Sequence, residues 1–130
     1  MSLIDDELKY TKEHEWVRME DDFIATCGLS DHAQDMLTTI VFVELPEVEY
    51  DVKQGEQIAV VESAKALVDI LSPLTGTIIE VNTELEESPE LINSDPYGAG
   101  WIFKIDVQRT DELDDLLTSD EYQAFIDTEV

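Results

Sequence analysis

The chain has 130 residues, of which 32 are acidic and seven are basic, so its formal net charge is −25 at pH 7. This length suits one domain with one core, and the charge excludes nucleic-acid backbones and anionic membrane surfaces as partners, because both would repel the protein. A single cysteine, Cys27, excludes an internal disulfide, and no apolar run reaches membrane length.

We therefore expect a cytoplasmic, monomeric protein whose partners are neutral or basic. A single domain is predicted over residues 1–130, with a core at about 8–107 and a C-terminal helical tail at about 111–127. Many short apolar runs followed by a tail of helical period predict a mainly β fold.

The first predicted element is a β-hairpin. Residues 15–19 and 23–27 are rich in β-branched and aromatic side chains, and the acidic segment 20–22 between them is typical of a turn. Residues 28–30 then break the strand pattern, because they include a glycine and a serine.

A short helix is predicted near residues 31–37. Asp31 can cap its first turn, and Gln34 stands at the third helical position, where its side chain can reach back in a capping box. The side chains expected on the buried face of this helix are Ala33, Met36 and Leu37.

Residues 40–45 form a β-branched, apolar run that Pro46 ends, and we interpret this run as a central strand. A turn at Gly55 precedes a further strand at 57–61. This strand leads into the stretch with the clearest functional pattern.

That stretch is residues 60–73, in which two runs rich in Val, Ile and Leu flank the small-residue tip Ser63-Ala64-Lys65-Ala66. The layout predicts a hairpin whose turn holds Lys65 in water. No bulky neighbour covers the lysine, so an enzyme that joins a prosthetic group to an amine can reach it. Lys65 is therefore the candidate attachment site.

The rest of the chain predicts more strands and a helical tail. A strand at 77–81 is followed by the polar segment 82–100, which shows no period and is predicted to be a long surface loop. Another strand is predicted at 101–105, and the side chains expected on one of its faces are Trp101, Phe103 and Ile105. In the tail, helical spacing is found at Leu113, Leu116, Leu117, Tyr122, Phe125 and Ile126, with Ser119 as the expected cap.

The segment around Lys65 resembles the lipoylation site of glycine cleavage system H proteins, in which a hairpin lysine carries lipoic acid as an amide. Other segments resemble the same family in the same order, and the likeness spans roughly residues 8–125. The segments that carry it are 10–17, 30–34, 41–46, 62–66, 91–98 and 100–101. An ordered set of this kind is far more specific than the short motif at Lys65 alone.

The resemblance implies a flattened β-barrel sandwich related to lipoyl and biotinyl domains, with the short helix near 31–37 and C-terminal helices. It also implies a carrier and not a catalyst, with lipoic acid bound covalently to Lys65. In the family, the arm takes an aminomethyl group from a pyridoxal-phosphate glycine decarboxylase (P protein) and presents it to a folate-dependent aminomethyltransferase (T protein). A dihydrolipoyl dehydrogenase (L protein) and a lipoate-attaching enzyme are the other implied partners.

Three carboxylates match residues of the family site. Glu62, three residues before the lysine, matches a glutamate that the attaching enzyme recognises, and Glu15 and Asp69 match carboxylates beside a groove that receives the arm. Negative charge in that groove can bind the aminomethyl ammonium. Two departures stand out: Glu13 replaces a small polar residue, and Thr38-Thr39 replace a common Gly-Asp.

Other functions stay open at this point. A biotin carrier usually places methionine on each side of its lysine, whereas Lys65 lies between Ala64 and Ala66. A related lipoyl protein that serves lipoyl transfer or sulfur metabolism would share the same site. An enzyme with Lys65 as a Schiff-base nucleophile is disfavoured, because a solvated tip lacks the apolar surroundings that activate such lysines.

No metal site or catalytic residue is predicted. His14 and His32 do not stand at ligand spacing with a cysteine or another histidine. Cys27 ends a β-branched strand, so we expect it in the core and not as a nucleophile.

Overall fold

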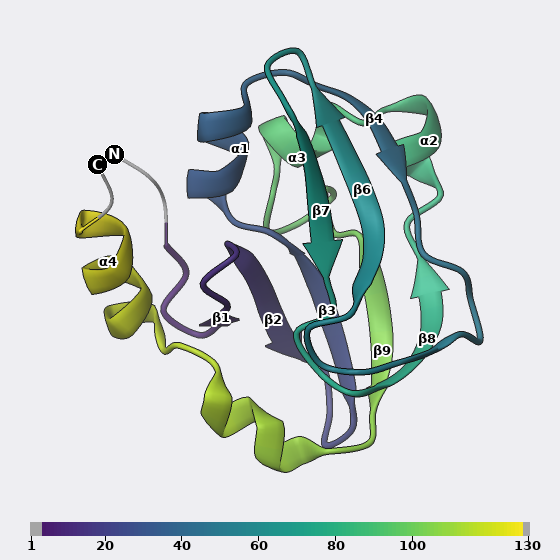
Figure 1. Ribbon diagram of the computed structural model, residues 1–130, viewed down its shortest axis with the longest axis vertical. Helices are drawn as coiled ribbons and strands as arrows, with labels where there is room; N and C mark the ends of the chain where they lie inside the picture. Colours follow the sequence, from purple (N-terminus) through teal and green to yellow (C-terminus); the bar gives the residue numbers. More distant parts are fainter. Residues whose placement is uncertain (1–3, 129–130) are drawn as a thin grey trace.

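The protein, a computed structural model that describes residues 4–128, is a sandwich of two β-sheets (Figure 1). Within these residues every pairing between strands is antiparallel. The predicted mainly β fold is confirmed, and its two sheets do not join into one closed barrel.

In the described part of the chain, six strands form the larger sheet in the order β1-β2-β3-β9-β8-β5, and three form the smaller sheet in the order β4-β6-β7. The strands of the larger sheet are β1 (Lys9–Tyr10), β2 (Glu15–Met19), β3 (Ile24–Leu29), β5 (Asp51–Val52), β8 (Gly76–Val81) and β9 (Phe103–Val107). Those of the smaller sheet are β4 (Ile40–Glu44), β6 (Gln57–Ser63) and β7 (Leu67–Leu71). The two predicted hairpins, β2 with β3 and β6 with β7, are both present.

Strand β3 extends further than the sequence predicts, through Gly28 to Leu29. Gly28 pairs with Trp16 on β2, and a Cβ atom at Gly28 would lie only 2.9 Å from the Trp16 ring. The glycine therefore continues the strand and leaves room for the buried indole, where the sequence analysis expects a break.

Strand β4 lies at the edge of the smaller sheet, so its interpretation as a central strand is wrong. A bulge between Ile40 and Phe42 shifts the register against β6. As a result Val41 and Phe42 are both exposed, whereas Ile40 and Val43 are buried. An apolar run cannot by itself distinguish a buried strand from an edge strand with a bulge.

Helix α1 (Asp31–Leu37) forms where it is predicted, but Ser30 and not Asp31 is its N-cap. The Ser30 hydroxyl accepts the backbone N–H of Ala33 at 3.2 Å, and Gln34 donates to the Asp31 carboxylate instead of forming a capping box. Ala33 and Leu37 are buried as expected, whereas Met36 is exposed.

The segment 82–100 is not the structureless loop that its composition predicts. It contains two one-turn helices, α2 (Glu84–Glu87) and α3 (Leu91–Ser94), which bury Leu85 and Ile92. Helices of this length are too short to produce a readable period.

The C-terminal tail is helical, as predicted, with a 3₁₀-helix η1 (Thr110–Asp115) followed by α4 (Ser119–Asp127). Thr118 caps α4 in a capping box with Glu121, so the cap lies one residue before the expected Ser119. The buried Tyr122 ring of α4 stacks on Tyr10 of β1 with 4.3 Å between the ring centroids.

Among residues 4–128, the buried apolar side chains form two groups. The main core lies between the sheets, and its members from β9 include Phe103 and Ile105. A smaller cluster beside α4 contains Trp16, and Trp101, which precedes β9, packs against this cluster instead of the main core. Cys27 is fully buried in the main core, and burial raises the pKa of its thiol, which fits the expected core role.

Replacement of Phe103 by Ala should lower the free energy of unfolding by about 3–5 kcal/mol, because the ring is fully buried and would leave a cavity. Chemical denaturation measures this change. Phe23, which is 60% exposed, provides the matched control, and Phe23→Ala should change stability by less than about 1 kcal/mol. An equal effect of the two substitutions would contradict the assigned core.

Candidate functional site

The turn that carries Lys65 is fixed by the side chain of Ser63. The Ser63 Oγ accepts the backbone N–H groups of Lys65 at 3.1 Å and Ala66 at 2.9 Å, and the Ser63 N–H donates to the Ala66 carbonyl at 2.8 Å. Ser63 is buried, whereas Ala64, Lys65 and Ala66 are exposed. The turn is therefore anchored from inside while its lysine remains accessible.

A second contact joins this turn to the chain before β4. The backbone N–H of Ala64 donates to the carbonyl of Thr39 at 2.9 Å. Asn93 of α3 holds the same segment, because it accepts the N–H of Ile40 at 2.8 Å and donates to the carbonyl of Thr38 at 2.8 Å. The hairpin tip thus rests on a segment that is itself hydrogen-bonded to a neighbouring helix.

Lys65 and Glu62 lie close together in the chain at the tip, and both are exposed. Within residues 4–128, neither an ion pair nor a hydrogen bond engages the Lys65 ammonium. The amine is therefore sterically accessible to an enzyme.

Glu15 of β2 contacts the β6–β7 hairpin at the end opposite to Lys65, and its side chain is only 2% exposed. One of its carboxylate oxygens accepts the Thr11 hydroxyl at 2.8 Å, and the other accepts the backbone N–H of Leu71 at 3.1 Å. Glu15 belongs to β2 and Leu71 to β7, so this carboxylate links the two sheets. Burial raises the pKa of Glu15 to about 7, and the hydrogen bonds from Leu71 and Thr11 oppose that rise.

A cleft of about 370 Å³ opens beside Glu15. The segments that line it are the start of β2, the turn before β6, the end of β7 and the end of η1, and its walls include Gln54, Leu71, Pro73 and Asp115. Such a cleft is large enough to receive a small group.

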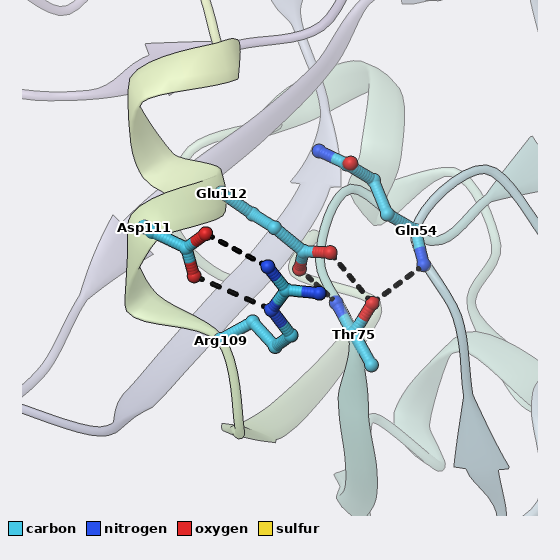
Figure 2. A network of polar contacts seen from close by, with 5 residues as sticks. All are labelled: Gln54, Thr75, Arg109, Asp111 and Glu112. Atoms are coloured by element: carbon cyan, nitrogen blue, oxygen red, sulfur yellow. Dashed lines mark hydrogen bonds and ion pairs between the residues drawn. The ribbon is translucent and has the colours of Figure 1, made fainter.

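A polar network next to this cleft joins η1 to the segments at Thr75 and Gln54 (Figure 2). Glu112 of η1 accepts both the backbone N–H of Thr75 at 2.6 Å and its hydroxyl at 2.8 Å. The hydroxyl oxygen of Thr75 in turn accepts the N–H of Gln54 at 3.0 Å. The exposed Arg109–Asp111 ion pair beside them, at 2.9 Å, contributes little because it is solvated.

The structure brings only part of the expected site together. Glu15 lines the cleft, but Asp69 is exposed on β7 and does not line it. Leu71 lies six positions after Lys65, which corresponds to roughly 20 Å of extended strand. The cleft beside Glu15 therefore lies at the end of β7 opposite to Lys65.

The histidines have structural contacts. His14 Nδ1 lies 2.8 Å from the Tyr122 hydroxyl, which also lies 2.7 Å from the Ser30 hydroxyl, so this histidine helps to hold α4 against β2 and α1. The rings of His14 and His32 are 5.0 Å apart. Within residues 4–128, no group of three His, Cys, Asp or Glu side chains is placed to hold a metal ion. Over the same residues, no helix is both long and apolar enough to cross a membrane.

Sequence reasoning missed the residues that support the site. Ser63 is a hydroxyl residue at the start of a turn, which is a common signal for local hydrogen bonds between side chain and backbone. The sequence could therefore have indicated that Ser63 stabilises the turn. The Thr39 carbonyl and the Glu112 contact join residues distant in sequence, and no local pattern indicates them.

Comparisons with known proteins identify the family of this chain. The family model described as glycine cleavage H-protein matches residues 8–129. The chain belongs to the glycine cleavage H-protein family.

Relatives of the family match along nearly the whole chain. A glycine cleavage system H protein of Shewanella halifaxensis is 55% identical over 129 residues, which cover 99% of this chain and all of that protein. One of Vibrio campbellii is 52% identical over 126 residues, which cover 97% of this chain and all of the relative. The crystal structure of an H protein from Mycobacterium marinum superimposes with a TM-score of 0.86 at 37% identity, over 93% of this chain and 97% of that one.

Thr38 provides a test of the segment beneath the tip. Its φ of 64° and ψ of −149° lie in a region that essentially only glycine occupies without strain, and its side chain is exposed. Thr38→Gly should therefore raise the free energy of unfolding by about 1 kcal/mol in urea denaturation. The matched control is Thr39→Gly, which should lower it by about 0.5–1 kcal/mol because it only adds backbone freedom. If Thr38→Gly and Thr39→Gly both lowered the free energy of unfolding, the result would contradict backbone strain at Thr38.

Glu15 provides a test of the contact between the sheets. Because its pKa is raised from 4.5 to about 7, the folded chain keeps a proton that the unfolded chain releases. The stability that this proton supplies is full below about pH 4.5 and is lost as the pH rises through about 7. Relative to Glu15→Gln, the unchanged chain should lose about 2–3 kcal/mol of unfolding free energy between about pH 5 and about pH 8.

Urea denaturation across this pH range measures the difference between the two chains. The amide introduced by Glu15→Gln would keep an oxygen for the Leu71 N–H, while its nitrogen would face the Thr11 hydroxyl. Asp69→Asn removes one exposed negative charge and controls for the change in net charge. If the free energy of unfolding changed with pH in the same way for the Glu15→Gln and unchanged chains, the result would contradict a proton on the Glu15 carboxyl.

Proposed function

We propose that this chain is the lipoyl-bearing carrier of glycine cleavage, with lipoic acid held as an amide on Lys65 Nζ. The observation that carries the proposal is the placement of Lys65 on an exposed, hydrogen-bonded hairpin tip, in a chain that matches the H-protein family over residues 8–129. On this proposal the protein is a carrier and not an enzyme.

The residues at the tip fit such a group. Ala64 and Ala66 have the smallest side chains that still restrict the backbone, so an approaching active site meets no obstruction beside the lysine. The group would supply a disulfide that accepts an aminomethyl group from one enzyme and releases it at the next. Ser63 would keep the attachment point in one place as different enzymes bind.

The proposed partners are those of the family: glycine decarboxylase (P protein), the aminomethyltransferase (T protein), dihydrolipoyl dehydrogenase (L protein) and the lipoate-attaching enzyme. Tethering suits a carrier with several partners, because a short flexible arm raises the local concentration of its end to the millimolar range at a docked enzyme. The net charge of −25 favours partners with basic docking surfaces.

Glu62, Glu15 and Asp69 have proposed roles in this function. We propose Glu62 as a contact of the attaching enzyme, because it is exposed and precedes Lys65 by three residues. Glu15 and Asp69 are proposed to accept hydrogen bonds from the ammonium carried on the arm, Asp69 along β7 and Glu15 in the cleft. With a pKa of about 7, Glu15 would be ionised in only part of the molecules at neutral pH.

We further propose that residues 1–130 act as a single domain in the cytoplasm. The support is that α4 packs on β1 through the Tyr10–Tyr122 stack, so the tail is part of the folded unit. Residues 1–3 and 129–130 of this range lie outside the described structure.

Replacement of Lys65 by Arg should abolish lipoylation without loss of the fold, because the side chain is exposed and arginine cannot form this amide under the enzyme's conditions. Intact mass after co-expression with a lipoate ligase measures the modification. The matched control is Lys53→Arg, an exposed lysine at another turn, which should acquire one lipoyl group like the unchanged chain. A lipoyl mass on the Lys65→Arg chain, or a biotin mass on the unchanged chain, would contradict the proposal.

A further inference from the structure

Two exposed apolar side chains flank Glu62 on the outer face of the smaller sheet. Phe42 on β4 pairs with Glu62 on β6, and Glu62 pairs with Leu67 on β7, so the three residues form one row across the sheet. Val61 and Ser63, the neighbours of Glu62 along β6, are buried, which directs Glu62 to the outside. Phe42 is 55% exposed and Leu67 is 63% exposed.

Phe42 faces outward because it alternates with the buried Val43 and pairs with the outward Glu62, and the bulge in β4 leaves Val41 exposed as well. In a regular strand side chains alternate between the faces, but here both Val41 and Phe42 are exposed between the buried Ile40 and Val43. Single exposed apolar residues need no explanation, but Phe42 and Leu67 stand on either side of one glutamate in a single row.

Acidic residues border this row. Glu44 on β4 and Asp69 on β7 pair with Val60 of β6, two positions further from the tip, and both carboxylates are exposed. The row therefore offers two apolar anchors with negative charge between and beside them. A complementary partner surface has an apolar patch with arginine or lysine side chains around it.

The position of the row beside Lys65 identifies the partner. Leu67 is two residues from Lys65, and Glu62 is three, so an active site that reaches Lys65 Nζ must sit against this end of the sheet. Only the attachment reaction takes place at that nitrogen. The other enzymes of the cycle act at the far end of a long arm, and they need not contact the row.

We propose that the lipoate-attaching enzyme binds this chain through Phe42 and Leu67 as apolar anchors. Glu62, which lies between the two anchors, pairs with a basic side chain of the enzyme. This inference rests on the proposed function. In the reaction the neutral Lys65 amine attacks the carbonyl carbon of an activated lipoyl ester or anhydride. A C–N bond forms, the bond from that carbon to the leaving group breaks, and the amine releases a proton to solvent.

The test is the rate of lipoylation of the unmodified chain by a purified lipoate ligase. Phe42→Ala and Leu67→Ala should each lower kcat/KM by about tenfold, mainly through a higher KM, because truncation of an interface anchor weakens binding. The matched control is Phe23→Ala, which removes an equally exposed phenyl ring outside the smaller sheet and should leave kcat/KM within about twofold. Melting temperatures of the three variants verify that each is folded.

Two outcomes would overturn the inference. One is a kcat/KM for Phe42→Ala and Leu67→Ala equal to that of the Phe23→Ala control. The other is a loss confined to the reaction with glycine decarboxylase after the variants have been fully lipoylated, which would assign the row to that enzyme. Failure of the proposed function is distinguishable, since the unchanged chain would then acquire no lipoyl group at Lys65 at any ligase concentration.

Discussion

The proposed function of this protein depends on one constraint, the hydrogen-bonded turn that fixes where the side chain of Lys65 begins. Ser63 Oγ holds the N–H groups of Lys65 and Ala66, and the Thr39 carbonyl holds that of Ala64. A carrier must offer the same attachment point to several enzymes in turn. A flexible turn would lose conformational entropy each time an enzyme bound it, and that loss would weaken every complex.

The same hairpin is held at its other end by a buried carboxylate. Glu15 accepts the N–H of Leu71 and thereby joins the larger sheet to the free edge of β7, while the Glu112–Thr75 contact joins η1 to the start of β8 nearby. Burying an ionised carboxylate is costly, and the raised pKa of Glu15 reflects that cost. The hydrogen bonds that Glu15 accepts from Leu71 and Thr11 offset part of this cost.

Sequence reasoning succeeded where local chemistry decides the structure. The lysine tip between two apolar runs, strand β2 and the helical tail all follow from short patterns. It failed where distant residues decide. The apolar run at 40–45 gives no sign of the bulge that leaves both Val41 and Phe42 exposed, and Glu15 appears in the sequence as an ordinary surface charge, although it is buried. Only the family resemblance drew attention to Glu15, and only the structure shows its contacts.

The central claim is that this chain carries the aminomethyl group in glycine cleavage, and the most direct test is its reaction with purified glycine decarboxylase and glycine labelled in the carboxyl carbon. The account predicts that the lipoylated chain supports release of labelled CO₂ in stoichiometric amount, and that the Lys65→Arg chain supports none. A fully lipoylated chain that elicits no labelled CO₂ from an active decarboxylase would contradict the account.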